Sequence, residues 1–120
     1  MNEPLPREYT YLSGAELLAR RAIPERDVEI PELGTVRVRG LTRGEVLQLK
    51  RELDTDFAAF EAGMLACGLV RPELDIAGAK AWQEAARPTE IDPVITAIME
   101  LSGMEATAER TAMARFPGGA

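Results

Sequence analysis

The chain has 120 residues, a length that fits one domain able to bury about two-thirds of its unfolded surface. Hydrophobic residues make up 46% of the sequence, enough to build a core without disulfides or metals. The formal net charge of −6 disfavours nonspecific binding to nucleic acid, so we expect no nucleic-acid partner.

Residues 1–7 contain two prolines and a glutamate and do not resemble a signal peptide. No stretch approaches the ~20 apolar residues that a bilayer-spanning helix requires, so we expect no membrane partner. The single cysteine, Cys67, cannot form an intramolecular disulfide, which favours a reducing compartment. These features predict a cytoplasmic protein.

The first twelve residues show no hydrophobic period, and we expect a flexible arm over residues 1–12. Ser13 and Glu16 have the spacing of a capping box, in which each side chain bonds the backbone amide of the other residue. A short helix is predicted from there to about Arg21. Two adjacent leucines are its only large apolar residues, so this helix needs a partner surface.

Residues 27–30 alternate between polar and apolar, and residues 35–39 do so again after a glycine-containing turn. This pattern predicts a β-hairpin near residues 27–39. An isolated hairpin is marginally stable, so its apolar face should pack on helices or pair with another subunit. That face is predicted to hold Val28, Ile30, Val36 and Val38.

Thr42 and Glu45 form a second capping-box match, which predicts a helix to about Leu53. Residues 55–69 are apolar almost all round, a pattern typical of a helix buried on several sides. The large side chains expected to be buried from this segment are Phe57, Phe60 and Met64.

Asp75 can cap a further helix that ends before Pro88 and carries Ile76, Ala79 and Trp82 on one face. The last helix is predicted to begin near residue 89, with residues 92 and 93 suited to its start. Its apolar stripe contains Ile91, Val94, Ile95 and Ile98. The glycine at position 103 suits the left-handed residue that follows a helix.

Together these elements predict an α+β fold that is predominantly helical, with about five helices and one N-terminal β-hairpin. We expect residues 13–104 to form a single globular domain and residues 105–120 to form a C-terminal helical or flexible tail. Exposed hairpin edges and spare apolar helix faces also favour a homo-oligomer.

The sequence contains no histidine, which removes the usual general base near neutral pH and the commonest metal ligand. One cysteine without histidine excludes an ordinary structural zinc site, and no phosphate-binding glycine motif is present. Cys67 lies in the most apolar segment and reads as a small buried hydrophobe. We therefore expect no catalytic residue, no metal, no cofactor and no enzyme activity.

Contacts with another protein are the remaining way for this chain to act. Arg37 and Arg39 share one strand face, which indicates either a basic patch or an ordinary solvated face, and the solvated face is favoured. The only tryptophan, Trp82, is either a core anchor or an interface hot spot, and core packing is favoured. The residues predicted to contact a partner are Arg37, Arg39, Trp82, Met104, Met113 and Phe116.

The order of these elements resembles the tail assembly chaperones of long-tailed, siphovirus-like phages and related prophages. The stretches that carry the resemblance are LSGAELL at 12–18, the hairpin and helix cap at 28–45, GMLACGLV at 63–70 and IDPVITAIMELSGM at 91–104. The most specific of them is the hairpin followed by the Leu-Thr-Arg start of a helix. Together they span residues 12–104.

The resemblance implies a protein that binds the tape measure protein and keeps it soluble while tail-tube subunits polymerise around it. It implies action in the cytoplasm of the host bacterium and absence from the mature virion. The alternative function is a structural virion component, such as a head–tail completion or tail-terminator protein, which would remain in purified particles.

Overall fold

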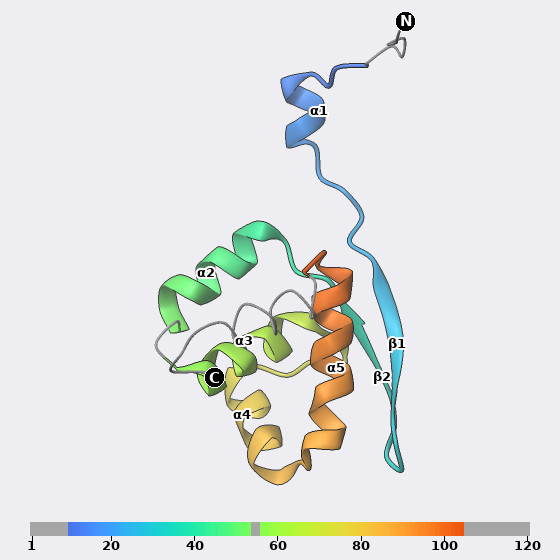
Figure 1. The fold of residues 1–120 in the computed structure, drawn as a ribbon, viewed down its shortest axis with the longest axis vertical. Coiled ribbons are helices and arrows are strands. Elements are labelled where there is room, and N and C mark those ends of the chain that lie inside the picture. The colour runs from blue at the N-terminus through green and yellow to red at the C-terminus, as the bar shows by residue number, and fades with distance from the viewer. Residues whose placement is uncertain (1–9, 54–55, 105–120) are drawn as a thin grey trace, which may run out of the picture.

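The computed structural model describes residues 10–53 and 56–104. The described residues form five helices, which are α1 (Gly14–Leu18), α2 (Arg43–Leu53), α3 (Phe57–Gly68), α4 (Ile76–Ala85) and α5 (Pro88–Leu101). They also form three strands, which are β1 (Glu25–Ile30), β2 (Gly34–Arg39) and β3 (Leu69–Arg71). The predicted α+β, predominantly helical fold is confirmed (Figure 1).

The sheet is antiparallel throughout, with the strand order β1-β2-β3. The predicted hairpin is present, and its register places Val28 opposite Val36. The third strand was not predicted. It follows α3 directly and pairs Leu69 with Val38 of β2. A strand of three residues is too short to show a period of two in the sequence, so only its pairing with β2 reveals it.

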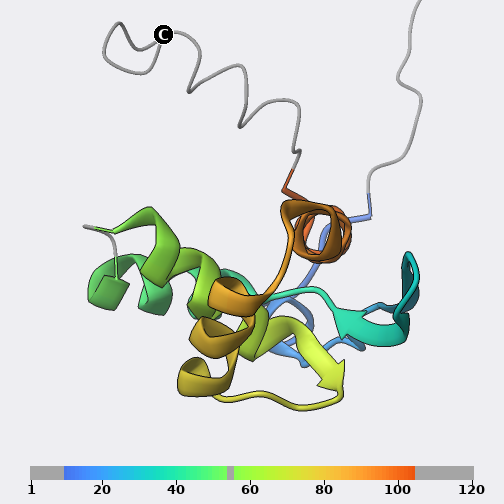
Figure 2. The same cartoon turned by 90° about the horizontal axis from the view of Figure 1, so that it is seen from below.

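The hairpin packs one face against α5, which crosses β1 and β2 and also contacts α3. Figure 2 looks along α5 and shows α2, α3 and α4 gathered on one side of it, with the hairpin on the other. Val38, Leu65, Val94 and Ile98 are fully enclosed where these elements meet. Val28 and Ile30 are buried as predicted, whereas Val36 is half-buried.

Local capping places the helix starts. Thr42 and Glu45 complete the predicted capping box of α2, with N–H donors 2.9 and 3.1 Å from the side-chain oxygens that accept them. Asp75 caps α4 by accepting the Gly78 amide at 2.7 Å. Asp56 caps α3 in the same way.

α5 begins at Pro88, one residue before the predicted start near residue 89. Pro88 occupies its first turn, where a backbone N–H has no partner within the helix, so the N–H that proline lacks costs no hydrogen bond. Pro93 lies inside the helix. The helix ends at Leu101 with Ser102 as its cap, and Gly103 follows with a φ of +79°, the left-handed conformation that glycine adopts readily. The Met104 amide then bonds the Met99 carbonyl, and the Gly103 amide bonds the Glu100 carbonyl.

One expectation about burial was wrong. Phe57 was expected in the core, but 69% of it is exposed. Burial in α3 is concentrated in its second half, where Gly68 lies against Ile98 of α5, whereas Phe57 stands at the first turn. Phe60 is half-buried against the core.

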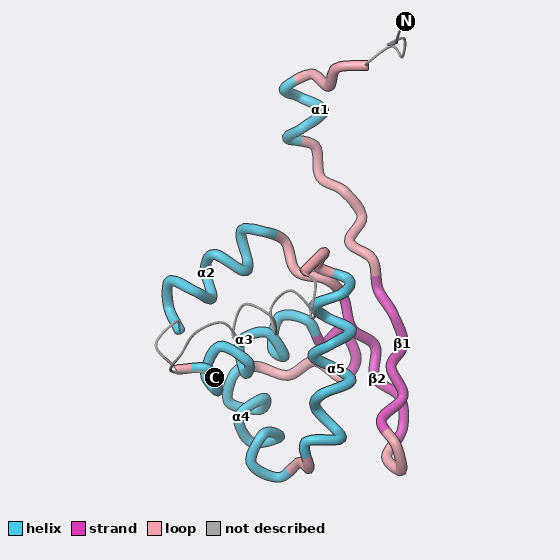
Figure 3. Tube along the Cα trace, viewed as in Figure 1, coloured by secondary structure: helices cyan, strands magenta, loops and turns pink. Residues whose placement is uncertain are grey.

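α1 stands apart from the rest of the structure. The capping box between Ser13 and Glu16 is present, with distances of 2.8 and 3.0 Å, but the helix ends at Leu18 rather than near Arg21. None of its residues is buried. An irregular segment joins it to β1 (Figure 3), so the packed part of the described chain begins near β1 and not at residue 13.

Candidate functional site

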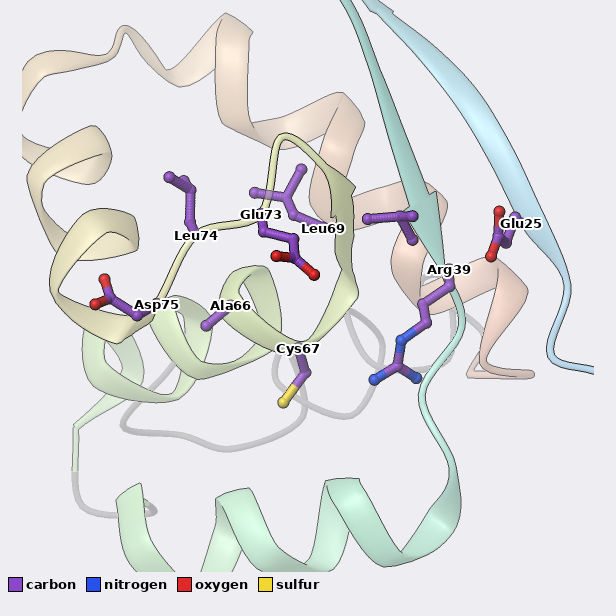
Figure 4. A pocket seen from close by; sticks show the side chains of 9 residues that line it. Glu25, Arg39, Ala66, Cys67, Leu69, Glu73, Leu74 and Asp75 are labelled. Carbon is purple, nitrogen blue, oxygen red and sulfur yellow. The ribbon is translucent and has the colours of Figure 1, made fainter.

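Hollows of about 750, 450 and 350 Å³ lie on the surface beside β3 and the loop that follows it. The larger hollow, of about 750 Å³, has a mixed polar and apolar lining. Figure 4 shows Arg39 and Glu73 reaching into the space beside Cys67. Its lining residues are Glu25, Arg39, Ala66, Cys67, Leu69, Val70, Glu73, Leu74 and Asp75.

The arginine of this larger hollow, Arg39, is engaged within the chain. Arg39 donates to both carboxylate oxygens of Glu45, at 3.0 and 2.7 Å, and to the Gly40 carbonyl at 2.9 Å. The hydrogen bonds to Glu45 raise the pKa of Arg39, and the same bonds lower the pKa of Glu45. This arginine therefore joins the end of β2 to the start of α2.

Cys67 is a poor nucleophile in this environment. Burial raises the pKa of its thiol, the negative charge of Glu45 raises it further, and Arg39 offsets only part of this. The thiol is thus protonated at neutral pH, whereas the reactive form is the thiolate. No cluster of three metal-ligating side chains occurs among residues 10–53 and 56–104.

Arg37, the other arginine expected to contact a partner, is also paired inside the chain. Its guanidinium lies 2.7 Å from a carboxylate oxygen of Glu25 and 2.7 Å from one of Asp27. These hydrogen bonds raise the pKa of Arg37. The strand face is therefore solvated and neutralised by its own carboxylates, which leaves little support for a basic patch.

The smallest of these hollows has a different character. Its volume is about 350 Å³ and its wall is almost wholly apolar, so we refer to it as the apolar hollow. Four parts of the chain supply the wall: the hairpin, β3, the loop after β3, and α4. The lining residues are Ile30, Val36, Leu69, Pro72, Leu74, Gly78 and Trp82.

Local structure explains how these residues meet. Ile30 and Val36 lie on the same face of the hairpin at its turn end. Gly78 and Trp82 stand four residues apart and so share one face of α4. Gly78 also leaves room beside Leu74, because an added Cβ would lie only 3.2 Å from the leucine side chain.

A chain of polar side chains runs from Trp82, in the wall of the apolar hollow, to the hairpin turn, and we call it the rim. Trp82 Nε1 donates to Glu90 Oε1 at 3.4 Å. Arg87 lies 3.5 Å from Glu90 Oε2 and 3.3 Å from Glu32 Oε1 in the hairpin turn. An apolar floor with a polar rim that includes tryptophan and arginine is the usual anatomy of a protein-binding surface.

Among the predicted contact residues that the structure describes, Trp82 alone lies in the apolar hollow. Arg37 and Arg39 lie on the other strand face, and Met104 is half-buried against the core. Met113 and Phe116 lie outside the described residues. Sequence reasoning missed the rest of the hollow, because it depends on the unpredicted β3 and on residues as distant in the chain as Ile30 and Trp82. The spacing of Gly78 and Trp82 was the one signal available in the sequence.

Comparisons with protein-family models, curated proteins and solved structures found no significant match to this chain. In the part of the chain that the structure describes, no helix has both the length and the apolar character needed to cross a bilayer.

Proposed function

We propose that this protein is a tail assembly chaperone of a long-tailed phage, which holds a helical segment of the tape measure protein in its apolar hollow. The observation that carries this proposal is the apolar hollow itself, with Trp82 in its wall and a rim of paired charges. A surface of this kind suits an amphipathic helix that inserts one or two large apolar side chains.

The tryptophan is held in an orientation that favours such binding. Its indole N–H is occupied by Glu90, and its ring is half-buried against the core while still lining the hollow. An aromatic side chain that is already oriented loses little conformational entropy when a partner covers it. Trp82 is therefore the residue expected to contribute most to binding of the client.

The resemblance of residues 12–104 to tail assembly chaperones supplies the identity of the client. In that role the protein acts in the cytoplasm of the host bacterium and leaves before the virion is complete. The net charge of −6 supports the role, because it keeps a complex with an aggregation-prone client soluble.

Co-expression with the tape measure protein of the same genome tests the proposal. The wild-type chain should co-purify with that protein and raise its soluble fraction. Trp82→Ser should weaken co-purification roughly tenfold or more, because it removes the largest side chain of the hollow. Leu47→Ser is the matched control, since it removes an exposed leucine from the outer face of α2.

Two results would contradict the proposal. The first is a wild-type chain that neither binds nor solubilises the tape measure protein. The second is its presence in purified phage particles at the copy number of a structural subunit, which would favour a head–tail completion or tail-terminator protein. Mass spectrometry of purified particles measures that copy number.

A further inference from the structure

We infer that α1 of one copy of this chain docks in the apolar hollow of a second copy. α1 is an ordered helix without a covering surface: Leu17 is 56% exposed and Leu18 is 86% exposed. A helix of five residues is too short to be stable in water by its own hydrogen bonds. An apolar surface outside α1 would therefore have to cover its leucines for the helix to be stable.

The direction of the arm keeps α1 away from its own hollow. The Gly40 amide bonds the Pro24 carbonyl at 3.1 Å, which fixes that proline to the body at the start of β1. From there the arm runs away from the hairpin (Figure 1), whereas the hollow lies along the hairpin in the opposite direction, from Leu69 beside Val38 to Ile30 at the turn end. To cover its own hollow the arm would have to fold back along β1, and docking on a second copy needs no such reversal.

The size and lining of the hollow fit this occupant. About 350 Å³ is near the lower limit of ordinary ligand pockets, which suits a pair of aliphatic side chains better than a large ligand. Leu17 and Leu18 are adjacent at the end of α1. Tyr11 and Leu12 are exposed as well and extend the apolar surface of the arm beyond the helix.

Charge complementarity favours a second copy over an unrelated apolar segment. The N-terminal arm, residues 10–24, carries Glu16 and two arginines, Arg20 and Arg21. Residues 25–104, in contrast, contain fifteen acidic and nine basic side chains. The rim of the hollow repeats this excess, since Arg87 faces two glutamates, Glu32 and Glu90. Arginines directly after the docked leucines would meet that rim.

The contact joins two different surfaces, so it closes into a dimer when two copies exchange arms and otherwise continues as a chain of copies. It also covers the hollow until a client arrives. This second consequence rests on the proposed function, and it means that tape measure protein and a neighbouring α1 compete for one site.

Mixing two defective variants tests the docking. Leu17→Ser/Leu18→Ser removes the apolar face of the arm, and Val36→Phe fills the hollow with an aromatic ring. Each variant alone should self-associate roughly tenfold or more weakly than wild type, measured by light scattering across a concentration series. An equimolar mixture should form one-to-one complexes, because it contains an intact arm and an intact hollow. Leu47→Ser should associate as wild type does.

A peptide of residues 10–24 provides a second measurement. Trp82 is the only tryptophan in the chain, so its fluorescence reports on the hollow. Added to the full-length arm variant, the peptide should shift the Trp82 emission to shorter wavelength, and a peptide with both leucines replaced by serine should not. The peptide measurement needs no substitution in the packed body, so its result is valid even where Val36→Phe fails to fold.

Docking is overturned by a wild-type chain that stays monomeric at high concentration, by an arm variant that associates as wild type does, or by a peptide that leaves the Trp82 emission unchanged. Failure of the proposed function looks different. An arm variant that self-associates normally and binds tape measure protein refutes only the docking. Arm-dependent self-association without binding of tape measure protein refutes only the chaperone function.

Discussion

α1 and α2 begin in the same way, but only α2 packs against the rest of the described chain. Each starts with a capping box, formed by Ser13 and Glu16 in α1 and by Thr42 and Glu45 in α2. α2 buries Val46 and Leu49 against α3, whereas α1 buries nothing. A capping box thus decides where a helix starts, and the surfaces around the helix decide whether it packs.

The same contrast separates the N-terminal arm, residues 10–24, from the packed body, residues 25–104. Both contain leucines, glycines, a hydrogen-bonding serine and a hydrogen-bonding glutamate. In the body these residues are enclosed or joined to other elements, and in the arm they stand in solvent. Four matched pairs of substitutions therefore measure how much more a residue contributes to stability when it makes tertiary contacts than when the same residue type is exposed.

Leucine truncation should give the largest difference. Leu65→Ala removes a fully enclosed side chain and should lower the free energy of unfolding by about 3–5 kcal/mol. Leu18→Ala removes one that is 86% exposed and should change it by less than about 0.5 kcal/mol at a concentration where the chain is monomeric. Urea denaturation measures both, and equal effects would show that α1 packs on the body.

Glycine substitution comes next. A Cβ on Gly40 would lie 2.4 Å from the Leu101 carbonyl oxygen, a backbone atom that cannot turn aside. Gly40→Ala should therefore destabilise the body by about 2–3 kcal/mol. Gly14→Ala meets nothing within 4 Å and should leave the melting temperature unchanged while adding helical signal in circular dichroism. A stable Gly40→Ala variant would show that α5 does not end against the strand.

The serines test a smaller effect. Ser102 Oγ accepts the Leu41 amide at 2.7 Å and donates to the Ile98 carbonyl at 2.6 Å. Ser102→Ala leaves the amide without this acceptor and should cost about 1–2 kcal/mol in thermal or urea unfolding. Ser13→Ala should speed hydrogen exchange in α1 alone, because it removes the helix cap without touching the body.

The glutamates should show the smallest difference, and it should depend on pH. The folded-state pKa of Glu45 is lowered, chiefly by its hydrogen bonds to Arg39. Its contribution to stability is therefore complete above its ordinary pKa of 4.5 and is lost as the pH falls through the lower folded value.

Glu45→Gln should thus cost up to about 1 kcal/mol near pH 7, and the gap to wild type should narrow below pH 4.5. Glu16→Gln, in the exposed capping box of α1, is the control and should leave the unfolding free energy of the body unchanged. Urea denaturation of both variants and wild type between pH 3 and pH 7 gives these differences. A gap that stays constant with pH would refute the role given to the Arg39–Glu45 pair.

The sequence by itself determined the elements whose signals lie within a few residues. The capping boxes place the starts of α1 and α2, the alternation over residues 27–39 forms the hairpin, and Gly103 ends the last helix. Each rests on bonds or periodicity between near neighbours in the chain, so the information is local. The same reasoning placed the start of α5 near residue 89, one residue from its position at Pro88, where a proline suits the first turn.

Only the tertiary structure decided which of these elements are covered. β3 exists because Val38 offers an edge to Leu69, thirty-one residues later, and Phe57 is exposed because the sheet and α5 cover the other end of α3. The apolar hollow likewise needs the hairpin, β3 and α4 to meet, which brings Ile30 and Trp82 into one wall across fifty-two positions of the chain. Burial and strand pairing depend on neighbours distant in the chain, which no local pattern records.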